Sequence, residues 1–251
     1  MQRRKMRRIR CCLCGLAALC LLALAGCTLF RPDPLAEQRG AIVLVFDTRT
    51  AGDLRTLCRE LSACDARATF FAFGQIQRGM ALTLKDLQSD GHAIGLSGLR
   101  GTDAQLYCSM YGRQKYFQDE IVPQVLGAKD CGLQPGYFLL YLPKKARPET
   151  LELPPFIVSK GFAHVVDVMP DHVPMQAKPA SGLTDPVVHA YPLTTNNFDR
   201  AQIAALAKRN EILVVAPNSQ VLPHLLDEAR VQGVPFATLA DLGSFPLATA
   251  D

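Results

Sequence analysis

Asp47 is the acidic residue of this 251-residue chain whose setting most directly suggests chemistry. It ends the apolar run from Ala41 to Phe46, which predicts a buried parallel strand with a carboxylate at its carboxyl end. Parallel α/β sheets present their binding and catalytic groups at that edge. Asp47 can therefore act as a base or contact a substrate there, or it can cap a helix or pair with Arg49 or Arg100.

The elements that must position Asp47 follow from the alternation of apolar strands and amphipathic helices. This rhythm implies right-handed parallel crossovers. We expect strands at 41–46, 66–74, 92–95, 137–140, 163–168, 187–190, 212–216 and 236–238, and helices at 53–61, 81–90, 148–160, 198–209 and 219–232. The Pro-rich segment 170–186 is expected to form a loop over the rim of the site.

Three short motifs in this region resemble those of the NodB-type polysaccharide deacetylases, in the same order and at similar spacing. The motifs are Phe46-Asp47, Ala68-Thr69-Phe70-Phe71-x-x-Gly74 and Asp90-Gly91-His92-x-Ile94-Gly95. Weaker similarities occur at 137–138 and 211–242. The resemblance implies an α/β fold: a single-domain, irregular, seven-stranded (β/α) barrel. On such a strand Phe70 and Phe71 point in opposite directions, one into the barrel and one beneath the helices, so both should be buried.

The resemblance also implies a metal-dependent site, and the chain departs from the family at the metal ligands. In the family two adjacent acids follow the first strand, the catalytic base and then a metal ligand, whereas this chain has Asp47-Thr48. The two metal histidines of the family correspond to Ser97 and Gly101. A metal that activates water needs about three protein ligands. We therefore expect no metal and no other cofactor, with zinc on non-standard ligands as the alternative.

Two more positions of the family differ here. The arginine that orients the base corresponds to Leu139, and the histidine that acts as general acid corresponds to Ala216. His189, at the end of the expected strand 187–190, is the histidine best placed to compensate. Ser97, Tyr141 and His189 are therefore candidate substrate-binding residues, with Asp47 in the position of the base. Ser97 lacks the partners of a serine hydrolase nucleophile.

Residues 1–26 predict an export signal. Six of the first ten residues are Arg or Lys, and the apolar stretch 11–25 is short for a membrane span. The end of this stretch, Leu24-Ala25-Gly26-Cys27, resembles a bacterial lipobox, in which Cys27 receives lipid after cleavage before it. An uncleaved anchor helix is the alternative. Either way the body is expected outside the cytoplasm, held to the cell membrane or outer membrane, with a tether at 27–39, the domain at 40–246 and a tail at 247–251.

Charge and cysteine content agree with an exported body. Without the six basic residues of the signal, 21 basic residues stand against 23 acidic ones, and no basic patch indicates nucleic acid. Disulfides persist in exported proteins. Proximity in sequence favours Cys58 with Cys64, at a helix end, and Cys108 with Cys131, across a loop after the third strand; four free thiols are the alternative.

These observations predict a lipoprotein whose degenerate polysaccharide deacetylase domain binds a cell-envelope glycan or an envelope protein without catalysis. The first rival is an active deacetylase of N-acetylated polysaccharide or peptidoglycan that uses Asp47 with ligands such as His189. The second is a purely structural envelope protein, which predicts a filled or flattened rim. An open groove at the rim would argue against the second rival.

Overall fold

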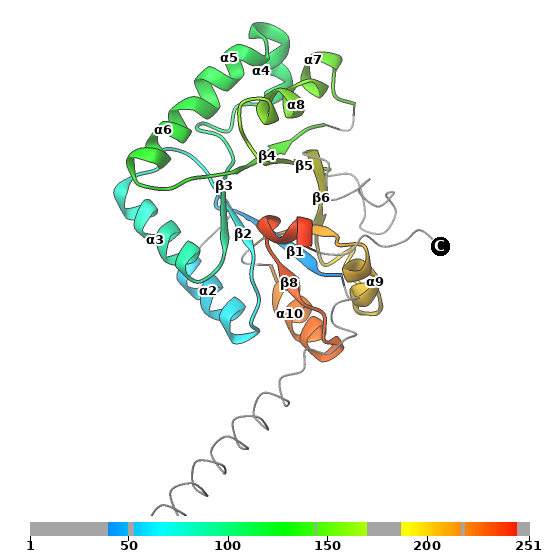
Figure 1. The fold of residues 1–251 in the computed structure, drawn as a ribbon. Coiled ribbons are helices and arrows are strands. Elements are labelled where there is room, and N and C mark those ends of the chain that lie inside the picture. Colours follow the sequence, from blue (N-terminus) through cyan, green and yellow to red (C-terminus); the bar gives the residue numbers. More distant parts are fainter. Residues whose placement is uncertain (1–39, 50–52, 144, 170–186, 217–218, 245–251) are drawn as a thin grey trace, which may run out of the picture. The chain divides into compact units, whose positions relative to one another are not determined.

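The computed structural model describes residues 40–49, 53–143, 145–169, 187–216 and 219–244. Within these residues seven parallel strands close into a barrel, and helices surround it (Figure 1). The barrel strands are β1 (Ile42–Asp47), β2 (Thr69–Ala72), β3 (Ala93–Leu96), β4 (Tyr137–Tyr141), β5 (His164–Val168), β6 (Val187–Leu193) and β7 (Ile212–Val215). The seven-stranded barrel expected from the sequence is confirmed.

β1 closes the barrel because it pairs on both edges. Its residues 43–45 pair with β7, and its residues 45–47 pair with β2. A short eighth strand, β8 (Phe236–Ala237), pairs with residues 42–43 on the β1 edge opposite β7. β1 is therefore buried along its whole length, and Asp47 stands at its carboxyl end with 2% of its surface exposed.

The helices flank the barrel, except for a short helical turn after β8 that lies across its opening (Figure 1). They are α2 (Leu54–Ala63), α3 (Arg78–Ser89), α4 (Ala104–Tyr111), α5 (Arg113–Tyr116), the π-helical turn η2 (Phe117–Ile121), α6 (Val122–Asp130), α7 (Pro148–Leu151), α8 (Leu153–Val158), the 3-10 turn η3 (Arg200–Gln202), α9 (Ile203–Lys208), α10 (Val221–Gln232) and the 3-10 turn η4 (Leu239–Ser244). Aspartates begin α2 and α4, where Asp53 and Asp103 accept from the backbone N–H groups of Arg55 and Leu106.

The core has two layers, as strand alternation requires. Val43, Val45 and Phe71 belong to the cluster inside the barrel, and Phe70 belongs to the cluster between the strands and the helices. Both phenylalanines are fully buried. The expectation that neighbouring aromatic side chains serve opposite layers is confirmed.

The segment between β3 and β4 is helical, which corrects the expected loop. Its helices α4, α5 and α6, with the π-helical turn η2, run almost without a break from 104 to 130. The apolar residues of this segment do not follow one helical period, because the capping Gly112 and η2 each change which face is buried.

The four body cysteines are free thiols, so neither expected disulfide forms. Cys58 and Cys64 are six residues apart along α2 and its cap, which separates them by about 9 Å along the helix axis. That exceeds the reach of a disulfide. Cys108 lies near Tyr116, whereas Cys131 follows the far end of α6, roughly 20 Å away along the helical run. Burial raises the pKa of Cys108 to about 11.

The signal, the tether, Cys27, the segment 170–186 and the tail all lie outside the described residues. Among the residues that are described, none of the helices is both long and apolar enough to cross a membrane.

Candidate functional site

A cavity of about 540 Å³ opens at the carboxyl ends of β1, β3 and β4. Its walls include Asp47, Arg49, Ser97, Tyr116, Leu139 and Tyr141. The cavity lies at the edge of the barrel where the sequence placed the site, and it brings together three of the four expected site residues. A hollow of this size at the barrel rim does not fit the filled rim of a purely structural protein.

Asp47 is held by Arg49, two residues further along the chain. Arg49 Nε and Nη2 donate to Asp47 Oδ2 at 2.8 and 2.6 Å, and the Arg49 backbone N–H donates to Oδ1 at 3.0 Å. The guanidinium also lies 4.7 Å from the ring centre of Tyr141 and 5.1 Å from that of Phe73. Burial by itself lowers the pKa of Arg49, but the hydrogen bonds and charge of Asp47 outweigh it, so the pKa is raised. Of the two arginines considered from sequence, Arg49 is the partner.

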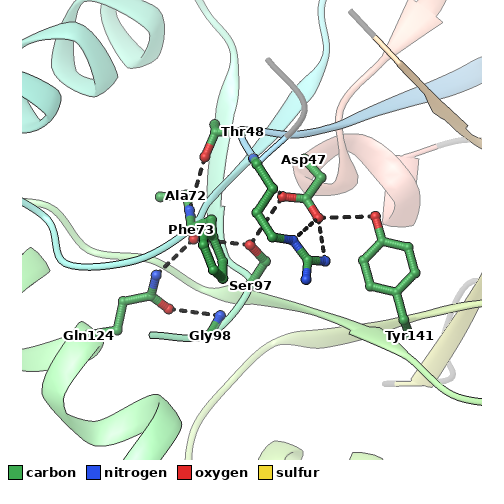
Figure 2. Close-up of polar contacts among 9 residues, drawn as sticks. Asp47, Thr48, Ala72, Phe73, Ser97, Gly98, Gln124 and Tyr141 are labelled. Atoms are coloured by element: carbon green, nitrogen blue, oxygen red, sulfur yellow. Dashed lines mark hydrogen bonds and ion pairs between the residues drawn. The ribbon is translucent and has the colours of Figure 1, made fainter. Parts of the chain in front are cut away.

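Tyr141 and Ser97 also contact Asp47 (Figure 2). The Tyr141 hydroxyl donates to Asp47 Oδ2 at 3.0 Å, and Ser97 Oγ lies 3.4 Å from Asp47 Oδ1 and 3.3 Å from the Ala72 carbonyl oxygen. Burial, followed by the charge of Asp47 and this hydrogen bond, raises the pKa of Tyr141, so the phenol stays protonated at neutral pH. The carboxylate is thus bound by a cation, a phenol and a hydroxyl.

The three positions that correspond to metal ligands do not fit a metal ion. Thr48 Oγ1 accepts from the Phe73 backbone N–H at 2.9 Å. Ser97 offers only a neutral hydroxyl, and Gly101 has no side chain at a φ of 70°. A Cβ at Gly101 would lie 3.1 Å from the Phe73 ring and 3.6 Å from Arg49 Nη1. Across the described part of the chain, no group of three or more His, Cys, Asp or Glu could hold a metal ion.

His189 does not join the cavity, contrary to expectation. Its neighbours Val188 and Ala190 face the barrel interior, so the intervening His189 points outward, where 44% of its side chain is exposed. There its Nδ1 lies 3.5 Å from Oδ2 of Asp167, its register partner on β5. The sequence placed His189 near the carboxyl end of its strand, but β6 continues to Leu193, and the alternation along β6 turns His189 away from the barrel interior.

Leu139 and Ala216, the two other positions at which the sequence was expected to differ from the family, differ in burial. Leu139 packs in the barrel core and lines the cavity, with 2% of its surface exposed. Ala216 is exposed just after the end of β7. Neither side chain can orient a base or donate a proton.

The sequence analysis missed the residues that hold the loop after β3. Glu120, fully buried in η2, accepts from the Arg100 backbone N–H, Arg100 Nε and Thr102 Oγ1 at 2.8, 2.8 and 2.6 Å. Gln124 accepts from the Gly98 N–H at 3.1 Å and donates to the Ala72 carbonyl oxygen at 2.8 Å (Figure 2). Their spacing of four residues was a helical signal, but no helix was expected there.

No family model and no curated protein matches the chain. Several solved structures are similar to it. A catalytic domain of peptidoglycan N-acetylglucosamine deacetylase from Eubacterium rectale aligns with 85% of this chain and 93% of its own, at 14% identity and a TM-score of 0.55. The fold is that of a family 4 carbohydrate esterase.

Two further structures show the same deacetylase-like barrel. A family 4 carbohydrate esterase from Streptomyces lividans, in complex with acetate, covers 84% of this chain and 98% of its own, at 15% identity and a TM-score of 0.53. A family 4 carbohydrate esterase from Bacillus anthracis covers 82% and 84%, at 18% identity and a TM-score of 0.51. At these identities the comparison establishes the barrel, and the chemistry must be argued from the site.

Proposed function

We propose that this chain is a membrane-anchored lipoprotein whose deacetylase-like domain binds cell-envelope glycan without hydrolysing it. The observation that carries the non-catalytic part is the pairing of Asp47 with Arg49. An arginine can orient a base, but a base must also keep one carboxylate oxygen open to take a proton from water. Here Asp47 Oδ2 accepts from the Arg49 guanidinium, and Asp47 Oδ1 accepts from the Arg49 backbone N–H. The Tyr141 hydroxyl is a further donor to Oδ2.

The other lining residues do not supply the missing chemistry. Neither histidine nor cysteine is among the described residues that line the cavity. The position of the orienting arginine is the buried Leu139, and that of the general acid is the exposed Ala216. Proton transfer groups of this kind contribute factors of roughly 10²–10⁴ each. Their combined absence supports binding rather than turnover.

The cavity has features that suit a sugar. Tyr116 and Tyr141 offer aromatic surface, and Thr102, Ser97 and the guanidinium of Arg49 offer hydrogen bonds. Ligand sites in proteins combine an apolar lining with a few placed polar groups in this way. Because a similar structure carries the name of a peptidoglycan N-acetylglucosamine deacetylase, N-acetylated envelope glycan is the first ligand to try.

The test uses the full-length chain in detergent micelles, with oligomers of N-acetylglucosamine and soluble peptidoglycan fragments as ligands. We expect saturable binding by calorimetry, at least ten-fold weaker for Tyr141→Ala, and acetate release no faster than in buffer. Leu82→Ala, on the exposed face of α3, is the control and should bind like the wild type. Acetate release at enzyme-like rates that Asp47→Asn abolishes would establish the active deacetylase instead.

A further inference from the structure

The guanidinium of Arg49 stands among the positions that the family uses for its metal. It binds Asp47 through Nε and Nη2, and its third nitrogen, Nη1, lies 3.6 Å from where a Cβ at Gly101 would be. Ser97, the other histidine position of the family, contacts the opposite oxygen of the same carboxylate. The cation therefore lies between the base position and Gly101, one of the two positions of the missing histidines, while Ser97 lies at the other oxygen of the carboxylate.

The Arg49 side chain is packed against its neighbours and does not extend into solvent. Phe73 and Tyr141 both lie against it, and only 29% of its side chain is exposed. A guanidinium cannot lose its proton in proteins, and its planar donors match a carboxylate. Its charge is thus permanent, and like charge repels a divalent ion from the same space.

We propose that Arg49 is a resident cation that takes the place of the metal, keeps divalent ions away from Asp47 and offers Nη1 to an acceptor oxygen of the ligand. The first two parts concern the protein alone. The last part rests on the proposed glycan binding. Arg49 neutralises the carboxylate as a metal would, but it provides no open coordination position at which water could be activated.

The direct test is the binding of Co²⁺, measured by calorimetry and by the visible absorption of the bound ion. Thr48→Asp with Ser97→His restores two ligands beside Asp47 and avoids the crowded Gly101. We expect this double variant to bind Co²⁺ weakly, and the addition of Arg49→Ala to tighten binding at least ten-fold. Arg49→Gln, which keeps more of the side chain packed, should act in the same direction. Circular dichroism checks that each variant is folded.

A matched control separates Arg49 from a general loss of positive charge. Arg100 pairs with Glu120 and does not line the cavity, so adding Arg100→Ala to the double variant should leave Co²⁺ affinity unchanged. The proposal is wrong if removal of Arg49 tightens binding no more than removal of Arg100 does. It is equally wrong if the wild type binds one Co²⁺ per chain after dialysis.

The ligand part has its own readout. Binding of an N-acetylglucosamine oligomer to the wild type should be the same with and without a chelator, and at least ten-fold weaker for Arg49→Ala. Chelator-sensitive binding, or full affinity in Arg49→Ala, contradicts the role of Nη1. If the wild type binds no oligomer, the proposed function and the role of Nη1 both fail, while the cobalt comparison still decides whether Arg49 replaces the metal.

Discussion

Asp47 stands where the resemblance to the deacetylase family predicts a catalytic base, but its neighbours change what the carboxylate can do. Arg49 turns back onto it from two residues away, and Tyr141 reaches it from β4. Gly101 is the position at which one of the family's histidines cannot simply be restored. Its φ of 70° belongs to the left-handed region, and Phe73 fills the space that a side chain would need.

Gly101→Ala should lower the free energy of unfolding by about 1–2 kcal/mol, because an alanine must adopt left-handed backbone there. Gly79→Ala, on α3 with open space around it, is the matched control and should be neutral or slightly stabilising. Urea unfolding of both variants measures the difference. Equal stabilities would show that the loop adopts another conformation at 101.

His92 provides a pH-dependent contribution to stability. It is buried, and its Nδ1 accepts from the Ala68 backbone N–H at 3.2 Å, which requires neutral imidazole. Burial lowers its pKa, against the opposing charge of Asp90 and with a smaller contribution from the charge of Arg67. The unfolded chain therefore binds the proton more tightly, and stability is lost as pH falls below about 6.5. Between pH 7.5 and 5, the free energy of unfolding should fall less for His92→Asn than for the wild type. The same dependence of unfolding free energy on pH in both proteins would contradict this role of His92.

At the scale of elements, the run from α4 to α6 shapes the site from outside the barrel. The π-helical turn η2 carries Glu120, and α6 carries Gln124. Together they bind the loop after β3, from Gly98 to Thr102, and Gln124 also binds the carboxyl end of β2. Single π-helical turns are often found at functional sites. Here one places a buried carboxylate beneath the rim of the cavity.

Glu120→Ala should destabilise the protein by about 2–3 kcal/mol, because it removes charge-assisted hydrogen bonds that are shielded from water. Arg100→Ala should cost less, since its side chain is 57% exposed and the Thr102 contact to Glu120 remains. Hydrogen exchange at the amide of Arg100, which donates to the Glu120 carboxylate, should accelerate selectively in Glu120→Ala. Unchanged exchange there would mean that the loop does not depend on η2.

The aromatic pair on β2 tests the two-layer core. Phe70→Ala opens a cavity beneath the helices, and Phe71→Ala opens one inside the barrel, where Gly95 lets its ring approach β3 closely. Each should cost about 3–5 kcal/mol in urea unfolding. Leu82→Ala, which is exposed, is the control. A loss below about 1 kcal/mol at both positions would contradict the burial of β2.

At the scale of the whole molecule, we propose that the signal-like segment that precedes the domain decides where it acts. The described body carries the cavity, whereas the lipobox-like residues up to Cys27 lie outside the described residues. A binding module with no turnover depends on being held near its ligand, because tethering raises the effective concentration. The anchor is therefore part of the proposed function.

Replacing Cys27 with Ser should leave the precursor uncleaved and abolish acyl labelling, since lipid attachment at that thiol precedes cleavage. Metabolic labelling with a fatty acid and gel mobility measure both effects. Cys58→Ser, in the body, is the control and should be labelled normally. Normal labelling and mobility of the Cys27 variant would favour an uncleaved anchor helix.

The sequence by itself determined the parallel α/β rhythm and the position of Asp47, whereas its resemblance to a known family predicted the barrel and assigned the ligand positions to 48, 97 and 101. Apolar periodicity reports the burial of each residue locally, so β1 and β2 could be read directly. Only the tertiary structure decided what surrounds Asp47, because Ser97 and Tyr141 reach it through the register of separate strands and Arg49 through a local turn. The face of His189 depended likewise on strand parity around the closed barrel.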